Sequence, residues 1–250
     1  MTTPALSLVT ICWNAAKTLP QTLESVLSQT VLPIEYLFVD GGSTDGTLEL
    51  LETYRPRFEQ RGCVFQVILQ QRIPGQAGIP SAWNQAIPLA KGEVIALLNA
   101  DDWYEDATLE MVLNAFKNDV DAVSVTVAMH AENTDDDWLF VPQSLSKLPW
   151  KMAVPHPGTF FRKSVYDRIG LYDTHYRISA DYDFIWRCRK AGLRWQYLTD
   201  RPLVHMKLGG LANSSRALAR HETYRIAHSH SAWYDLRPLA AFLGRAITGR

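Results

Sequence analysis

The stretch Tyr36–Thr47 reads YLFVDGGSTDGT and decides the fold class of this chain. A short apolar run ends at the carboxylate of Asp40, passes through the glycine-rich turn 41–46, and leads into an amphipathic segment that starts at Leu48. This order predicts a strand, a turn and the start of a helix. In open α/β sheets, ligands bind just beyond the carboxyl ends of the strands. A carboxylate at such an end can accept hydrogen bonds from a base N–H or a sugar hydroxyl, so the stretch indicates a nucleotide pocket.

Apolar runs alternate with segments of helical periodicity through the first half of the chain. Strands are expected at 6–13, 36–39, 64–69 and 94–98, and helical faces at 19–27, 48–54, about 81–89 and 109–116. Thr18 and Gln21 have the spacing of a capping box before the first helix. This alternation predicts an α/β fold with a mostly parallel sheet and helices on both faces.

The second half of the chain has a less regular pattern. We expect a strand at 122–128, an extended segment at 158–162, and a helix at 182–191 that Gly192 ends. Short edge strands are expected at 195–198 and 203–206, and a helical region from about 214 onward. The stretch 130–150 carries the acidic run 135–137 and is expected to be a variable excursion.

Composition excludes several classes of protein. Lys+Arg 25 and Asp+Glu 26 leave a net charge of -1, which does not suit a nucleic-acid partner. Cys12, Cys63 and Cys188 are far apart and show no metal-type spacing, which fits a reducing compartment. The first residues lack the basic region of a signal peptide, and no apolar run approaches the roughly 20 residues of a membrane span. We therefore expect a soluble cytoplasmic protein, attached at most to the inner surface of the membrane.

Two adjacent carboxylates follow the strand at 94–98, in the sequence Asn99-Ala100-Asp101-Asp102. Mg²⁺ and Mn²⁺ prefer carboxylate, water and phosphate oxygens as ligands. A solvated acidic turn that caps the next helix is the alternative. The position of the pair one strand–helix unit after the Asp40 turn favours a metal site.

Several motifs in order resemble the family 2 glycosyltransferases of GT-A fold. They are SLVTICWN at 7–14, VDGGSTDGT at 39–47 and LNADDWY at 98–104, and SADYD at 179–183 resembles the acidic motif near the acceptor. The ordered match covers roughly residues 6–210. Within the family, 78–84 and 155–162 look like the branch that builds bacterial surface polysaccharides such as O-antigen.

The resemblance implies a set of residues that bind the donor. Asp40 would hold the base of a nucleoside diphosphate sugar, most often UDP, and Thr10, Asn14, Ser43 and Asn84 would line the same donor site.

The resemblance also implies a divalent metal, Mg²⁺ or Mn²⁺. Asp101 matches the last carboxylate of the family's Asp-x-Asp motif, which contacts the metal, and Asp102 would assist the metal or the donor sugar. Asn99 replaces the first Asp of that motif, so a ribose contact survives better than strong metal binding. His205 precedes a flexible glycine-containing loop and is a further candidate metal ligand, with a purely structural role as its alternative.

Asp181 matches the family's general base, which implies inversion at the anomeric carbon. A helix N-cap is the alternative role of Asp181, and Asp183 is the second candidate for the base. His156 and Arg162 are expected to shape the acceptor pocket, and the acceptor is expected to be a glycan or a lipid-linked molecule.

The resemblance divides the chain into a glycosyltransferase domain at 1–212 and a helical C-terminal extension at 213–250. Residues 1–128 would form the half that binds the nucleotide sugar, and 129–212 the acceptor half. The extension ends in an amphipathic, basic helix that suits either an anionic membrane surface or packing on the domain.

Two other classes of function remain as alternatives. An NAD-type dehydrogenase also uses a strand, a glycine turn and a helix, but the G-x-G-x-x-G fingerprint after the first strand is missing. A non-catalytic nucleotide- or carbohydrate-binding module would not need Asp40, Asp101, Asp102 and Asp181 together.

Overall fold

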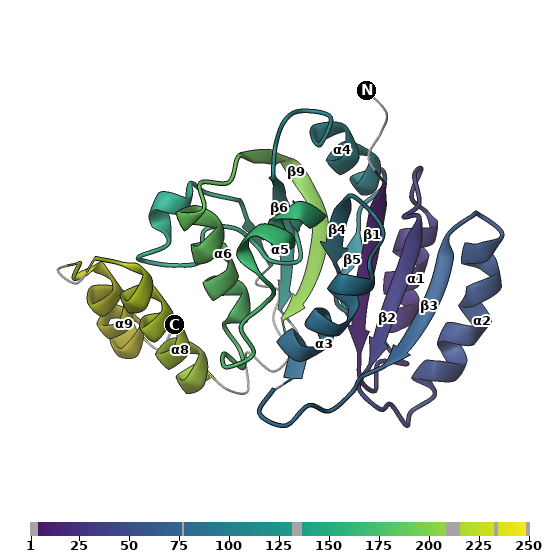
Figure 1. Ribbon diagram of the computed structural model, residues 1–250, viewed down its shortest axis with the longest axis horizontal. Coiled ribbons are helices and arrows are strands. Elements are labelled where there is room, and N and C mark those ends of the chain that lie inside the picture. Colours follow the sequence, from purple (N-terminus) through teal and green to yellow (C-terminus); the bar gives the residue numbers. More distant parts are fainter. Residues whose placement is uncertain (1–4, 77, 132–136, 209–215, 233–234, 249–250) are drawn as a thin grey trace.

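A twisted sheet runs through the molecule and carries helices on both faces (Figure 1). The computed structural model describes residues 5–76, 78–131, 137–208, 216–232 and 235–248. Its strands are β1 (Leu6–Cys12), β2 (Glu35–Asp40), β3 (Val64–Leu69), β4 (Val94–Leu97), β5 (Trp103–Tyr104), β6 (Ala122–Ala131), β7 (Trp138–Phe140), β8 (Thr159–Arg162) and β9 (Trp195–Leu208). Its helices are α1 (Leu19–Leu27), α2 (Thr47–Glu59), α3 (Gly78–Ala86), α4 (Thr108–Ala115), α5 (Lys163–Ile169), α6 (Ala180–Lys190), α8 (Arg216–His230) and α9 (Arg237–Thr248), with short 3₁₀ turns η1 (Ile87–Leu89) and η2 (Leu145–Lys147).

The strand order is β3-β2-β1-β4-β8-β6-β9-β5, and β7 pairs with β6 outside this path. The pairs β1–β2, β1–β4, β2–β3 and β6–β9 are parallel, whereas β8 runs antiparallel to β4 and β6. The predicted α/β class with a mostly parallel sheet is therefore confirmed.

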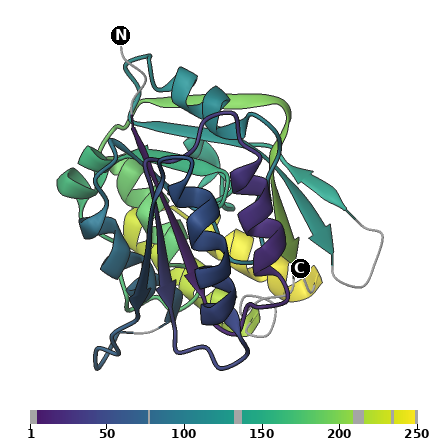
Figure 2. The same ribbon diagram turned by 90° about the vertical axis from the view of Figure 1, so that its right-hand side faces the viewer.

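Alternate residues of each central strand enter two separate cores, as the period of a strand requires. On β2, Tyr36 and Phe38 pack with the apolar residues of α1, α2 and α4. Leu37 and Val39 face the other way and pack with α3, α5 and α6. Figure 2 shows α1 and α2 lying side by side over the first face.

The N-terminus of α6 lies at the edge of the sheet where β1, β2 and β4 end. β9 is parallel to β6 and starts opposite its first residue, Ala122, so the short connection 191–194 places the C-terminus of α6 at the amino edge of the sheet. The helix must then run back toward the carboxyl edge, as in other crossover units. Figure 1 shows this course, with the start of α6 on the same lower side as the end of β2. The topology alone therefore brings residues near 180 to the edge that carries Asp40 and Asp101.

Some predicted elements differ from those observed. Residues 195–208 form one long strand between β6 and β5, whereas two short edge strands were predicted. Thr18 makes no side-chain capping bond to α1, so the predicted capping box is wrong. The helix α5 was not predicted, because its few residues carry too short a pattern to reveal a helix. Gly192 has a φ of +66° just after α6, which confirms its predicted role at the end of that helix.

The C-terminal helices pack on the rest of the molecule. Ile226 and Ala227 of α8 are buried in the same core as α6, and α9 contacts α8 through rings of Phe242 and Tyr224 with centroids 5.1 Å apart. The predicted domain boundary at 212 and the acidic run 135–137 lie wholly or largely outside the described residues. The division into domains stays a prediction. Among the described residues, no helix combines the length and the apolar character that a membrane span requires.

Candidate active site

The turn after β2 is built around the carboxylate of Asp40, which is fully buried. Its Oδ1 accepts hydrogen bonds from the backbone N–H groups of Gly42, at 2.9 Å, and Ser43, at 2.8 Å. Its Oδ2 accepts the hydroxyl proton of Ser43 at 2.5 Å. In this arrangement Asp40 orders the turn through both of its carboxylate oxygens. The predicted base contact stays a prediction.

The loop after β1 is locked to this turn through Asn14. Its Oδ1 accepts the N–H of Thr44 at 2.9 Å, and its own N–H donates to the hydroxyl of Ser43 at 2.8 Å. Asn14 has a φ of +50°, a conformation that asparagine tolerates better than most residues. Ala15 continues the link by donating its N–H to the Thr47 hydroxyl at 2.8 Å. The two loops therefore form one surface at the ends of β1 and β2.

Trp13 stands on this surface with 68% of its area exposed. A large aromatic side chain is rarely left so open at the end of a buried strand, and it is available to stack on a planar base. Sequence reasoning did not expect this exposure, because a tryptophan that ends an apolar run looks like part of the core. The signal that could have revealed it is its position next to Asn14 in the first motif.

Three predicted site residues form hydrogen bonds within the fold. Thr10 is fully buried, and its hydroxyl pairs with that of Tyr36 at 2.9 Å. Asn84 holds the backbone of Tyr172 by two hydrogen bonds of 2.8 and 3.0 Å. Arg162 donates to the carbonyls of Val120 and Phe116, at 2.7 and 2.6 Å, near the end of α4. The donor roles of Thr10 and Asn84 and the acceptor role of Arg162 stay predictions.

The carboxylates that follow β4 lie in different surroundings. Asp101 is partly exposed, whereas Asp102 is 1% exposed. Asp102 accepts hydrogen bonds from the Nδ2 of Asn99 at 3.0 Å and from the backbone N–H of Lys207 at 3.3 Å. Burial, with the neighbouring charge of Asp101, raises the pKa of Asp102 well above its ordinary value. A cation beside these carboxyl groups would offset the cost of placing two negative charges next to each other with one of them buried.

No group of three or more His, Cys, Asp or Glu side chains is placed to hold a metal ion within the described part of the chain. A magnesium-type site does not need such a group, because one or two carboxylates suffice when substrate phosphates and water complete the coordination. Asp101 is partly exposed and fits a site of that kind, whereas both oxygens of Asp102 accept hydrogen bonds within the fold. The metal roles of the two residues stay predictions.

His205 is hydrogen-bonded through both ring nitrogens. Its Nδ1 is hydrogen-bonded to Nε2 of His130 at 2.8 Å, and its Nε2 to Oε1 of Glu105 at 2.5 Å. Its ring stacks on that of Trp103 with centroids 4.9 Å apart. These contacts favour the structural alternative, and the role of His205 as a metal ligand stays a prediction.

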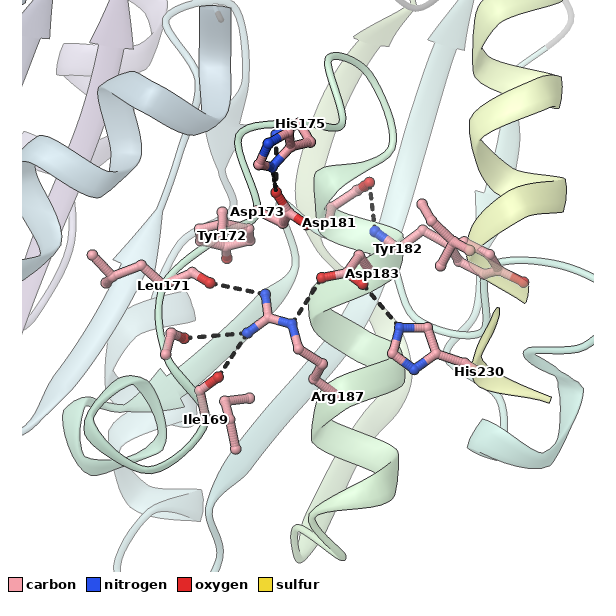
Figure 3. A network of polar contacts seen from close by, with 12 residues as sticks. Ile169, Leu171, Tyr172, Asp173, His175, Asp181, Tyr182, Asp183, Arg187 and His230 are labelled. Carbon is pink, nitrogen blue, oxygen red and sulfur yellow. Dashed lines mark hydrogen bonds and ion pairs between the residues drawn. The ribbon is translucent and has the colours of Figure 1, made fainter. Parts of the chain in front are cut away.

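Asp181 lies in the first turn of α6 (Figure 3). Its Oδ1 accepts the N–H of Tyr182 at 2.7 Å. Burial raises the pKa of Asp181 to about 6, against the opposing effect of backbone N–H groups, and the charge of Glu222 adds to the rise. The N-cap position belongs to Ser179, so the interpretation of Asp181 as a cap is wrong. A carboxylate with a pKa near neutrality suits a general base, since such a group can both hold and release a proton at physiological pH.

Asp183 is tied into an ion-pair network on the other side of the helix (Figure 3). It accepts hydrogen bonds from Nε of Arg187 at 2.8 Å and from Nε2 of His230 at 2.9 Å. Burial acts to raise the pKa of Asp183, but His230 and Arg187 together hold it below its ordinary value. With both oxygens engaged and 5% of the residue exposed, Asp183 is not placed to receive a proton from an acceptor. These contacts favour Asp181 over Asp183 as the base, and the role of Asp183 stays a prediction.

His156 is 8% exposed and lies against the ring of Trp83, with centroids 4.5 Å apart. Its Nε2 is hydrogen-bonded to the hydroxyl of Tyr172 at 3.0 Å. Burial lowers the pKa of His156 to about 4, which keeps the ring neutral at physiological pH. Its part in an acceptor pocket stays a prediction.

Residues 7–185 match the family model described as Glycosyl transferase family 2. This chain belongs to glycosyltransferase family 2. The family 2 enzyme is 32% identical over 219 residues to the PGL/p-HBAD biosynthesis glycosyltransferase of Mycobacterium tuberculosis, a match that covers 86% of this chain and 81% of that protein. It is also 33% identical over 134 residues to the putative glycosyltransferase EpsH of Bacillus subtilis, covering 54% of this chain and 37% of that protein. These matches confirm the predicted family and establish glycosyl transfer as the class of reaction.

Solved structures share the fold of this family 2 enzyme. TarS of S. aureus has a TM-score of 0.70 at 20% identity, covering 98% of this chain and 44% of TarS. The structure of TarS 1–349 in complex with UDP-GlcNAc has a TM-score of 0.69 at 21% identity, covering 98% and 73%. The mannosyltransferase PcManGT of Pyrobaculum calidifontis, in complex with GDP-Man and Mn²⁺, has a TM-score of 0.65 at 18% identity, covering 99% and 76%. At these identities the likeness concerns the fold alone.

Proposed function

We propose that this family 2 enzyme is an inverting, metal-dependent transferase that uses a nucleoside diphosphate sugar, in the first place a UDP-sugar. The acceptor is a hydroxyl of a glycan or a lipid-linked molecule. The observation that carries the proposal is Asp181, a carboxyl group with a pKa of about 6 at the sheet edge that also carries Asp101 and the Asp40 turn.

The chemistry assigned to Asp181 follows from its charge and its place. An acceptor hydroxyl is a poor nucleophile while it keeps its proton, and a carboxylate within hydrogen-bond reach can take that proton during attack. The acceptor oxygen forms a bond to the anomeric carbon on the face opposite the diphosphate. The bond between that carbon and the diphosphate oxygen breaks, and the electron pair leaves with the diphosphate. A single displacement of this kind inverts the configuration.

Asp101 is the residue that would hold a divalent cation, with Asp102 next to it in the chain, and the partly exposed position of Asp101 supports this assignment. When bound, the cation supplies positive charge that stabilises the departing diphosphate. The mannosyltransferase PcManGT, whose structure holds Mn²⁺ together with GDP-Man, lends support to this assignment.

The nucleotide is assigned to the surface formed by the loops after β1 and β2. Trp13 would stack on the base, and the turn ordered by Asp40 would carry the hydrogen-bonding groups at Asn14 and Ser43. The choice of UDP draws on TarS 1–349, whose structure holds UDP-GlcNAc. Assembly of a surface glycan or glycolipid draws on the named role of the mycobacterial relative in PGL/p-HBAD biosynthesis.

Calorimetric titration tests the donor assignment. We expect UDP or GDP to bind in the presence of Mn²⁺ and to bind more weakly in its absence, whereas NADH should not bind. Binding of NADH without binding of UDP or GDP would overturn the assignment. Binding of nucleotide with no turnover on a panel of UDP-, GDP- and dTDP-sugars would instead indicate a non-catalytic module.

A further inference from the structure

The loop that leads into α6 is held by a carboxylate from α8. Glu222 is 5% exposed, and its Oε1 accepts the backbone N–H of Arg177 at 2.8 Å. Its Oε2 accepts the N–H groups of Ile178 and Ser179, both at 2.9 Å. These residues directly precede α6, which begins at Ala180. We propose that Glu222 is a positioning residue through which α8 sets the place of Asp181.

Glu222 supplies acceptors for the three backbone N–H groups just before the first turn of α6. An N-cap side chain would instead accept the N–H of the second or third helical residue. Ser179 occupies the N-cap position without making that bond. Its hydroxyl is instead directed to α8, with Oγ 3.4 Å from the carbonyl oxygen of Ala219 and 3.3 Å from the hydroxyl of Thr223. The backbone two residues before Asp181 is thus fixed by α8.

The charge of Glu222 also acts on Asp181. A second negative charge nearby disfavours the ionised form of a carboxyl group, and Glu222 adds in this way to the rise that burial produces in the pKa of Asp181. Tyr172, from the segment before α6, is a further titratable group that interacts with Asp181, and Asp183 on the same helix is paired with Arg187 and His230. Glu222 is therefore the neighbouring carboxylate whose removal should move the titration of Asp181.

A second contact keeps α8 in register with α6. His230, the last residue of α8, reaches Asp183 at 2.9 Å, as Figure 3 shows. Glu222 and His230 both lie beyond residues 7–185, the part that the family model matches. The base is thus supported by a helix outside the segment that defines the family.

Carbon-13 NMR of the enzyme labelled at the Asp carboxyl carbons tests this proposal, with the Asp181 signal assigned through Asp181→Asn. In the wild type the signal should titrate near pH 6. In Glu222→Gln we expect the midpoint to fall by roughly half a pH unit or more, because a nearby negative charge is lost. The amide protons of 177–179 should also exchange faster with solvent.

Glu35→Gln is the matched control. Glu35 is likewise buried and bonded, accepting the hydroxyl proton of Ser7 at 2.5 Å and the N–H of Lys91, but it lies at the start of β2, away from α6. The Glu35→Gln variant should leave the titration midpoint of Asp181 and the amide exchange of residues 177–179 unchanged. A folded Glu222→Gln enzyme with the wild-type midpoint and exchange would overturn the proposal.

If Glu222→Gln does not fold, Glu222→Asp serves in its place. This variant keeps the negative charge on a side chain that is shorter by one methylene group. Faster exchange of 177–179 would then support the proposal, and wild-type exchange would overturn it. The proposal rests on Asp181 as the base, yet the two can fail separately. Full turnover by Asp181→Asn would remove the catalytic assignment, while the NMR result would still decide whether Glu222 positions Asp181.

Discussion

At the scale of single residues, the most specific prediction concerns Asp181. Because its pKa is about 6, the form that accepts a proton is lost as the pH falls through that value. We expect kcat/KM to drop about tenfold per pH unit well below pH 6, and Asp181→Asn to lower turnover by roughly 10²–10⁴-fold while donor binding persists. Initial rates from pH 4.5 to 8 check both. Near wild-type turnover in the variant would disprove the base assignment.

Replacing Asp101 is expected to weaken the binding of nucleotide when metal is present. Asp101→Ala should weaken the affinity for UDP in Mn²⁺ by roughly tenfold or more and change it little without metal, because one carboxylate ligand is removed. Asp106 is exposed and lies five residues further along the chain, so Asp106→Ala is the control. Equal affinities of both variants in Mn²⁺, measured by calorimetry, would exclude Asp101 as a ligand.

The residue scale also shows what sequence alone could predict. The motifs predicted where Asp40, Asp101 and Asp181 lie, because each follows a strand end or a helix start that local pattern reveals. They did not predict that the side chains of Thr10, Asn84 and Arg162 form hydrogen bonds within the fold. The partners of these side chains lie 26, 88 and 42 residues away in sequence, so only tertiary packing decides their roles.

At the scale of elements, we expect the contact between α6 and α8 to contribute measurably to the free energy of unfolding. His230→Ala should lower the free energy of unfolding by about 1–3 kcal/mol, because Asp183 loses a buried partner. The matched control is His175→Ala, since His175 has 88% of its side chain exposed and pairs with Asp173 at the surface, where such pairs contribute little. Urea unfolding of both variants compares them. Equal losses would contradict the structural role of the His230 contact.

The same contact gives a pH dependence of stability. The pKa of Asp183 is lowered in the folded state, so its contribution is present above the unfolded pKa of about 3.9. It should be lost as the pH falls through the folded pKa. Urea unfolding between pH 3 and 6 should show that the free energy of unfolding falls less with decreasing pH in Asp183→Asn than in the wild type.

Elements were predicted best where the pattern was long. The buried strands and amphipathic helices of the first half have clear periods, which predicted β1, β2, β4 and α4. The long strand β9 was mistaken for two edge strands because polar residues 199–201 interrupt its pattern. The two-residue strand β5, which pairs with it at Trp103 and Tyr104, is too short to recognise.

At the scale of the whole molecule, the choice between a membrane contact and packing for the C-terminal helix can be tested. Leu236, Leu239 and Leu243 are exposed at 71, 41 and 50%. Apolar residues on a basic helix favour an anionic surface. We expect the full chain to float with vesicles that contain anionic lipid, and a chain lacking 236–250 to float less. Equal flotation of the two would show that α9 serves packing alone.

The central claim is inverting transfer with Asp181 as the base, and the configuration of the product tests it most directly. The enzyme, Mn²⁺ and α-linked UDP-sugars are incubated with a panel of p-nitrophenyl glycosides, and the anomeric coupling of the new linkage is measured by proton NMR. We predict a β-linked product from the wild type and none from Asp181→Asn. An α-linked product, or the same product from both, would contradict the account.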